Sequence, residues 1–217
     1  MPNGYYHQDV DNYIVEHWHG GYILRVPPWR IGIDHPLFGT DHFESHLDRF
    51  PDGQFIGDRR AANFGVCATL RMSRPPDCEV LPWLEAIGDK SLAGHEPDGT
   101  WLYIALIWVH PNYRGHGMGS AFLRTCIALA VKLGLHGVYA VPLLVGYRHV
   151  ADEMDIESYA SEVVWGNQSD PFVTRFMKCG FRPSFSGDAY VSDYMDAPSA
   201  GNAGVLLRWE NPYFKDH

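Results

Sequence analysis

The chain lacks an apolar run long enough to span a membrane, and its first residues have neither the basic start nor the apolar core of a signal peptide. It has only 4 cysteines in 217 residues, at spacings that suit neither a disulfide framework nor a metal site. Basic residues are also scarce, because 17 Lys and Arg stand against 26 Asp and Glu, for a net charge of −9. This deficit disfavours nucleic acid as a partner and favours a cationic amine. We therefore expect one cytoplasmic domain over residues 1–217, without a metal, that binds neither nucleic acid nor membrane.

A glycine-rich loop between a strand and a helix is the most informative segment. Trp101–Val109 is apolar, β-branched and aromatic, which predicts a buried strand. Residues 120–133 are rich in helix formers and end at Gly134, a common helix stop. Between the two elements, glycines alternate at 115, 117 and 119. A loop whose free N–H groups open onto a helix N-terminus is suited to bind phosphate.

Three kinds of phosphate loop can be compared with this segment. A Walker A loop needs a lysine before its final Ser or Thr, but Gly119 precedes Ser120 directly. A dinucleotide fingerprint needs Gly or Ala at position 120 and an acidic residue about twenty residues later, and neither is present. The run from Arg114 to Gly119 instead resembles the pyrophosphate loop of the GNAT acetyltransferase superfamily, Arg/Gln-x-x-Gly-x-Gly/Ala. The alternative is a glycine-rich turn that binds nothing.

A second segment resembles the same superfamily. Asp170-Pro171 is a favourable helix start, since an N-cap side chain precedes a proline at the first helical position. We expect a helix over 172–179. In the superfamily this segment ends Phe-Tyr-x-x-x-Gly-Phe, whereas residues 175–181 read Arg-Phe-Met-Lys-Cys-Gly-Phe. Phe176 therefore stands where many members carry a tyrosine that protonates the departing thiolate.

The resemblance implies an α/β (α+β) fold of the GNAT type. Such a fold has a mixed, mostly antiparallel central sheet with flanking helices, and a splay between the fourth and fifth strands admits the pantetheine arm. The resemblance also implies acetyl-CoA (coenzyme A) as the cofactor and a primary amine of a small molecule or peptide as the acceptor. The residues it assigns to coenzyme A are Trp108, Val109, Arg114, Gly115, His116, Gly117, Met118, Gly119, Ser120, Phe172 and Phe176.

Periodicity predicts further elements in an α/β order. We expect a first strand at 22–26, and a helix over 39–50 with Asp41 as N-cap and Glu44 as its capping-box partner. Along 64–72, Phe64 and every second residue after it should face one side of a strand. The other expected elements are strands at 54–57, 137–141 and 203–209, and a short helix at Trp83–Ile87 within a long loop over 73–100.

An insertion at 142–169 stands where the superfamily usually has a short connection, and we expect it to roof the acyl end of the cofactor. A helix is expected near Ile156–Trp165 within it. Polar side chains of the insertion and one later tyrosine are the candidate catalytic residues: Tyr147, His149, Asp152, Glu153 and Tyr190. Alternatively, the insertion stiffens the sheet edge or makes a contact in a homodimer.

Acetyl transfer requires that the carbonyl be polarised, the amine lose a proton and the thiolate leave. Backbone N–H groups near Val109 could polarise the carbonyl. The strand Trp101–Val109 has no Asp or Glu, so the base could be His110 or a polar residue of the insertion. The missing tyrosine could be replaced by Tyr147, Tyr159 or Tyr190, or the thiolate could leave without help.

A longer resemblance covers residues 20–212. The segments at 43–55 (F-E-S-H-L-D-R-F-P-D-G-Q-F), 98–103 (D-G-T-W-L-Y), 146–154 (G-Y-R-H-V-A-D-E-M) and 208–212 (R-W-E-N-P) resemble the acetyltransferase-like domain fused to carbon–nitrogen hydrolases in some bacterial proteins. We expect no hydrolase partner within this chain. The rival to an enzyme is a non-catalytic acyl-CoA-binding sensor or regulatory module, and Phe176 and the acid-free strand favour that rival.

Overall fold

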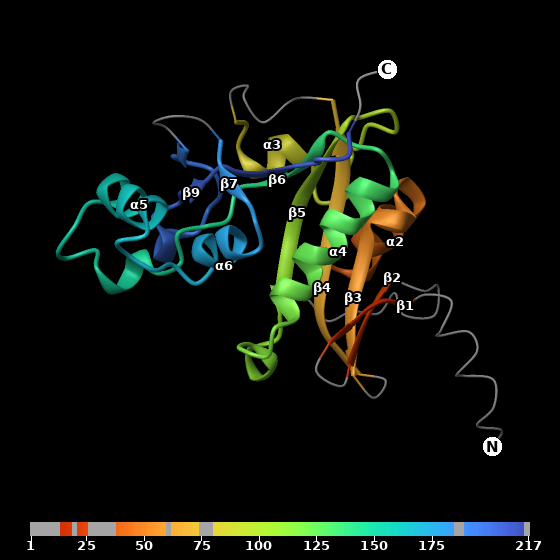
Figure 1. Cartoon of the computed structure of the whole chain (residues 1–217), viewed down its shortest axis with the longest axis horizontal. Helices are drawn as coiled ribbons and strands as arrows, with labels where there is room; N and C mark the ends of the chain where they lie inside the picture. Colours follow the sequence, from red (N-terminus) through yellow and green to blue (C-terminus); the bar gives the residue numbers. More distant parts are fainter. Residues whose placement is uncertain are drawn as a thin grey trace.

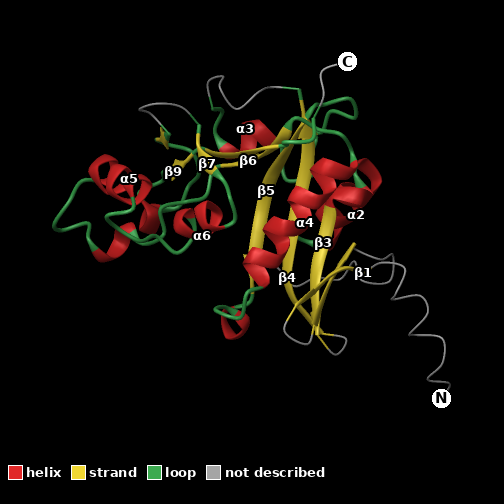
Figure 2. Cartoon of the chain, in the orientation of Figure 1, coloured by secondary structure: helices red, strands yellow, loops and turns green. Residues whose placement is uncertain are grey.

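The computed structural model describes residues 14–18, 21–25, 38–59, 62–73, 80–184 and 189–214. Its centre is a twisted sheet of eight strands in the order β1-β2-β3-β4-β5-β6-β10-β7 (Figures 1 and 2). In that order the strands are β1 (Ile14–Trp18), β2 (Gly21–Arg25), β3 (Gln54–Arg59), β4 (Ala62–Met72), β5 (Trp101–Val109), β6 (Gly137–Ala140), β10 (Leu207–Glu210) and β7 (Arg182–Pro183). Of the strand pairs described, only β5–β6 is parallel, and helix α4 (Met118–Lys132) makes the crossover that such a pair needs.

Helices cover the sheet on both faces. The amphipathic α4 packs on one face, together with α6 (Val173–Lys178) and α5 (Ile156–Trp165) of the insertion. Helices α2 (Thr40–Arg49) and α3 (Trp83–Ile87) pack on the other. The insertion and the small ribbon of β8 (Tyr190–Val191) and β9 (Gly204–Val205) lie beyond β6, away from β1 and β2 (Figure 1). The sheet is therefore the middle layer, with one hydrophobic cluster on each side.

Two glycines of the sheet lie beneath the start of α4. Gly57 of β3 and Gly65 of β4 are register partners, and the side chain of Met118 lies over both. A Cβ atom at Gly57 or Gly65 would lie 2.6 Å or 2.5 Å from the sulfur of Met118, which is closer than real contacts allow. The two glycines thus leave the space that the side chain of Met118, the first residue of α4, occupies on the sheet.

The parallel pair separates after three residues. Its register runs from Trp101↔Gly137 to Tyr103↔Tyr139 and ends there, although β5 continues to Val109. On its other edge β5 stays paired with β4, and a bulge at Ala105 adds one residue to β5 between Ile104 and Leu106. The expected GNAT-type fold, with a mostly antiparallel sheet splayed at this place, is confirmed.

Several predicted elements match closely. The strand at Trp101–Val109 and the helices at Trp83–Ile87 and Ile156–Trp165 have the expected bounds. The strand expected at 203–209 is divided between β9 and β10, which belong to different sheets. Strand β1 had not been predicted, and it makes the strand expected at 22–26 the second one. No helix among the described residues is long and apolar enough to cross a membrane.

Two details of the sequence analysis were wrong. The N-cap of α2 is Gly39, not Asp41: the helix starts at Thr40, and the Gly39 N–H donates to the ring Nδ1 of His42 at 3.0 Å. Phe64 does not share a face with Val66, because the β3–β4 register slips at this point, and a bulge turns its side chain to the α4 face. There Phe64 stacks on Tyr113, with ring centroids 3.6 Å apart.

Candidate active site

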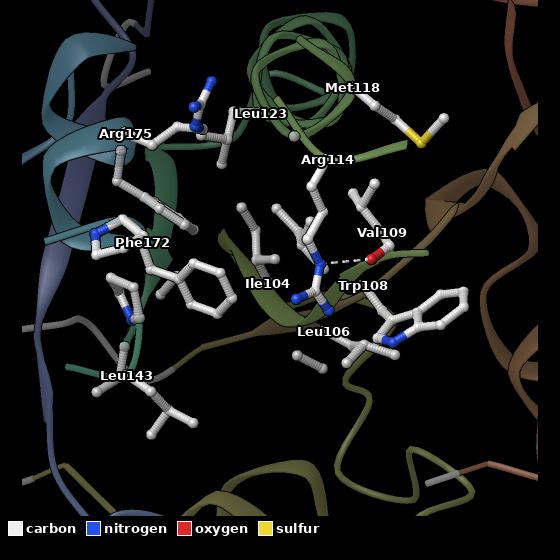
Figure 3. A pocket seen from close by; sticks show the side chains of 18 of the residues that line it. Ile104, Leu106, Trp108, Val109, Arg114, Met118, Leu123, Leu143, Phe172 and Arg175 are labelled. Atoms are coloured by element: carbon white, nitrogen blue, oxygen red, sulfur yellow. Dashed lines mark hydrogen bonds between the residues drawn. The ribbon is translucent and has the colours of Figure 1, made fainter. Parts of the chain in front are cut away.

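A cavity of about 430 Å³ opens along the unpaired edge of β5 (Figure 3). It lies where β5 and β6 separate, so strand residues supply its floor and two helices its sides. The described residues that line it are Trp83, Ile104, Ala105, Leu106, Ile107, Trp108, Val109, Tyr113, Arg114, Gly115, Gly117, Met118, Gly119, Leu123, Ala140, Val141, Pro142, Leu143, Pro171, Phe172, Arg175, Phe176, Tyr194 and Met195.

The glycine loop forms one end of the cavity. Gly115 (φ +81°) and Gly117 (φ +89°) adopt backbone conformations that L side chains rarely take, and Gly117 is the N-cap of α4. A Cβ atom at Gly115 would meet nothing within 4 Å, so the loop borders open space there. Since the first N–H groups of a helix lack partners within it, this end offers backbone donors and the positive end of the helix dipole to an anion.

Two arginines flank these donors. The Arg114 side chain folds back over the end of β5, where its Nε donates to the Val109 carbonyl at 3.0 Å (Figure 3). Arg175 reaches across from α6 and donates from Nη1 to the Ser120 hydroxyl at 3.1 Å. The sequence analysis had not assigned Arg175 to the cofactor, although it belongs to the segment that resembles the superfamily. A helix and a loop more than fifty residues apart in sequence thus place two positive charges at the start of α4.

The opposite end of the cavity is aromatic. Trp83 of α3 donates from Nε1 to the Ala105 carbonyl at 2.8 Å, which holds the indole beside the bulge of β5. The Trp83 backbone N–H donates to the Tyr194 carbonyl at 2.6 Å. The hydroxyl of Tyr194 is hydrogen-bonded to that of Tyr103, directly before the point where β5 leaves β6. Burial is the main cause that raises the pKa of both phenols well above the usual value.

A buried carboxylate connects the insertion to the cavity wall. Asp170 is fully buried, and its Oδ1 accepts the backbone N–H groups of Phe172 and Val173 at 2.8 and 3.1 Å. Its Oδ2 accepts the Gly146 N–H at 2.8 Å and the Tyr159 hydroxyl at 3.3 Å. Burial, followed by the charge of Asp170, raises the pKa of Tyr159 to about 12. Asp170 therefore fixes the start of α6, whose N-cap Phe172 and helical residues Arg175 and Phe176 form part of the wall.

The cavity contains most of the expected cofactor residues and none of the expected catalytic ones. Of the residues assigned to coenzyme A, His116 and Ser120 do not line it, and the others do. His110, Tyr159 and the five candidate catalytic residues also lie outside its wall: Tyr147, His149, Asp152, Glu153 and Tyr190. His110 directly follows β5, and its N–H donates to the Phe64 carbonyl at 2.8 Å. The other six fold into the lobe beyond β6, because the insertion packs its apolar side chains on α5 and α6. No Asp, Glu or His belongs to the described wall, and Tyr194, which does, was missed because it lies in a loop without a motif.

Comparisons with known proteins agree with this architecture. The model of the acetyltransferase (GNAT) family matches residues 27–145. The uncharacterized N-acetyltransferase YkwB of Bacillus subtilis (strain 168) is 30% identical over 182 residues, which cover 82% of this chain and 77% of that protein. The probable hydrolase YhcX of the same organism is 28% identical over 186 residues, or 86% of this chain, but the match spans only 34% of YhcX.

A solved structure shares the fold. The GphF GNAT-like decarboxylase in complex with isobutyryl-CoA superimposes with a TM-score of 0.65 and 22% sequence identity, covering 80% of this chain and 85% of that one.

Proposed function

Because this chain belongs to the acetyltransferase (GNAT) family, we propose that it transfers an acetyl group from acetyl-CoA to a primary amine of a small molecule or peptide. The observation that carries the proposal is one continuous cavity, which joins the glycine loop to the splayed edge of β5. A cofactor with an anionic head and a long thioester arm matches both ends of such a cavity. A loop that bound nothing would need neither the flanking arginines nor the open edge.

Coenzyme A fits this cavity in one direction. We place its pyrophosphate against the backbone N–H groups of residues 115–120, with Arg114 and Arg175 supplying the positive charge. The pantetheine arm then runs along β5 from Val109 towards Ala105, a distance of about 13 Å for four residues of strand. Phe172 and Phe176 cover it from α6. The thioester accordingly lies near the bulge, at the aromatic end.

The wall suggests how acyl transfer proceeds. Since β5 has no strand partner on its β6 side after Tyr103, its backbone N–H groups on that edge are available to polarise the thioester carbonyl. The amine nitrogen forms a bond to the carbonyl carbon, the C–S bond breaks, and coenzyme A leaves. With no Asp, Glu or His in the described wall, the amine gives its proton to water and attacks in its neutral form.

The inner wall also limits the acceptor. Trp83, Leu143 and Met195 present apolar surface where the amine must approach the thioester. An amine with an aliphatic or aromatic body would bury that surface, whereas a polyamine would leave charges unpaired. The net charge of −9 still favours the approach of a cation from solution. We therefore favour a primary amine with one positive charge and an apolar body.

The cofactor assignment is tested by a substitution in the loop. Gly117→Val should abolish binding of coenzyme A in calorimetry, because a branched side chain would occupy the phosphate position and strain a backbone at φ +89°. Gly134→Val is the matched control: Gly134 (φ +63°) follows the other end of α4 with open space around it, and this variant should still bind. Unchanged affinity in a folded Gly117→Val protein would contradict the assignment.

Turnover separates the enzyme from an acyl-CoA sensor, because both would bind coenzyme A. The parent protein is incubated with acetyl-CoA and a panel of aliphatic, aromatic and peptide amines, and acylated products are measured by mass spectrometry. A product with an apolar amine supports the proposed function. Binding of coenzyme A with no product from any amine in the panel would favour the sensor.

A further inference from the structure

Two buried hydroxyl groups meet at the inner end of the cavity. Tyr103 belongs to β5 and Tyr194 to the loop between β8 and β9, 91 residues later. The two side chains are 2% and 4% exposed, and their hydroxyls are hydrogen-bonded to each other. Only Tyr194 of this pair lines the cavity. The pair is therefore buried in the sheet on one side and borders the cofactor space on the other.

One of the two hydroxyl protons of this pair has no acceptor among the described residues. Each phenol carries one O–H donor, and a mutual hydrogen bond consumes only one of the two protons. Within the described part of the chain, neither hydroxyl has a further hydrogen-bond partner. A buried donor without an acceptor is unfavourable. An acceptor atom of a ligand in the cavity would complete the pair.

Tyr194 is held firmly at the level of the bulge in β5. Its N–H donates to the Asn202 carbonyl at 2.8 Å, and its carbonyl accepts the N–H of Trp83, which is itself bonded to Ala105. The residue before it, Asp193, has a φ of +48°. A side chain fixed by bonds on both sides of its backbone loses little freedom when it binds a ligand.

We propose that the Tyr103–Tyr194 hydroxyl pair donates a hydrogen bond to the sulfur of coenzyme A as the C–S bond breaks, and so replaces the tyrosine absent at position 176. The inference rests on the proposed function, because it requires the cofactor direction given above. In that direction the sulfur lies at the bulge, beside Tyr194 and opposite the glycine loop.

The hydrogen bond stabilises the leaving group without giving up its proton. The electron pair of the C–S bond goes to sulfur. The first proton of the ammonium has gone to water, and the thiolate takes the second proton, which the nitrogen releases after its bond to the carbonyl carbon has formed. Burial raises the pKa of both tyrosines, so the pair stays protonated while the thiolate forms. The products are one amide and one free thiol.

Binding tests the inference without any turnover. At pH 9, where much of the coenzyme A thiol is ionised, calorimetry compares coenzyme A with desulfo-CoA, which lacks the sulfur. The parent should prefer coenzyme A, and Tyr194→Phe should reduce that preference about tenfold. Tyr139→Phe is the matched control, because it removes a hydroxyl from the same buried cluster that is bonded to the sulfur of Met72. It should keep the preference.

A double variant protects the test against misfolding. Tyr194→Phe alone leaves the Tyr103 hydroxyl unpaired, whereas replacing both residues with Phe leaves no orphan donor. The double variant should lose the preference for coenzyme A over desulfo-CoA as well. A preference within twofold of the parent in either folded variant would overturn the inference.

Turnover provides the second arm. Tyr194→Phe should lower kcat by ten- to a hundredfold and leave the affinity for desulfo-CoA unchanged. Adding Phe176→Tyr to the Tyr194→Phe variant should then raise kcat again by at least tenfold. A loss of kcat in Tyr194→Phe that Phe176→Tyr does not restore would indicate a structural role for Tyr194 and overturn the inference.

If the parent acylates no amine but its preference for coenzyme A depends on Tyr194, the proposed function fails and the hydrogen bond to sulfur stands. If amines are acylated and the preference is insensitive to Tyr194, only the inference fails.

Discussion

At the scale of single residues, position 176 departs most clearly from the family pattern. Phe176 lines the cavity, packs edge-to-face on Phe181 at 5.1 Å, and has no group to donate to a leaving thiolate. Its place in the chain could be predicted because the segment 175–181 is short and contiguous. The hydroxyl pair that we assign to its task could not, since Tyr103 and Tyr194 meet only through the fold.

Introducing the family's tyrosine at position 176 of the otherwise unchanged protein should therefore have little effect on kcat. We expect Phe176→Tyr to leave kcat within about tenfold of the parent, or roughly 1.4 kcal/mol, because a donor already serves the sulfur. Steady-state kinetics with acetyl-CoA and an acylated amine from the panel measures it. An increase of several hundredfold would mean that the parent lacks an acid and would favour the sensor.

At the scale of elements, the insertion at 142–169 holds α6 in place instead of covering the cavity with polar side chains. Pro142 and Leu143 line the cavity directly, and the rest of the insertion is tied to the site through Asp170, whose carboxylate joins the turn at Gly146, the hydroxyl of Tyr159 on α5 and the start of α6. Asp152 and Glu153 are outside the cavity wall. The elements of the insertion were predictable from local patterns, but the direction in which they fold was not.

Asp170→Asn should therefore damage the site from a distance. An amide cannot accept all four hydrogen bonds, so we expect a loss of about 1–3 kcal/mol in unfolding free energy and weaker binding of coenzyme A through a displaced Arg175. Urea denaturation and calorimetry measure the two effects. Joint replacement of Asp152 and Glu153 by Asn and Gln is the control and should alter neither. If the control raises the acceptor KM instead, the insertion reaches the substrate after all.

At the scale of the whole molecule, two histidines join the α2 face to the loop before β5. His46 is fully buried, with its Nε2 at 2.7 Å from the Lys90 carbonyl. His95 stacks on Phe50, and its Nδ1 accepts the Arg71 N–H at 3.1 Å. Burial is the largest cause that lowers the pKa of both; for His95 the charge of Arg71 comes next. Both rings are therefore neutral in the folded protein at neutral pH.

This arrangement predicts the sign of the pH dependence of stability. Below the ordinary histidine pKa of about 6.5, the unfolded chain binds protons that the folded chain does not, so unfolding becomes more favourable as the pH falls. Stability should be full above about pH 7, fall as the pH drops through 6.5, and level off below the folded pKa values. Thermal melts from pH 8 to 5 measure it. The joint replacement of His46 and His95 by Gln should flatten the profile, whereas His149→Gln, at an exposed ring, should not.

The sequence by itself determined the strand, glycine loop and helix at 101–132, the short helix at Trp83–Ile87 and the presence of a helix after Asp170-Pro171, because each depends on neighbours within a few residues. The start of that helix was placed too early, since α6 begins at Val173 with Phe172 as its N-cap. The sequence did not predict the bulges at Phe64 and Ala105, since a bulge depends on the register of two strands. Only the tertiary structure decided which distant side chains complete the cavity. Arg175 meets Ser120 and Tyr194 meets Tyr103 because helix packing and sheet order bring them together, and no local pattern encodes that encounter.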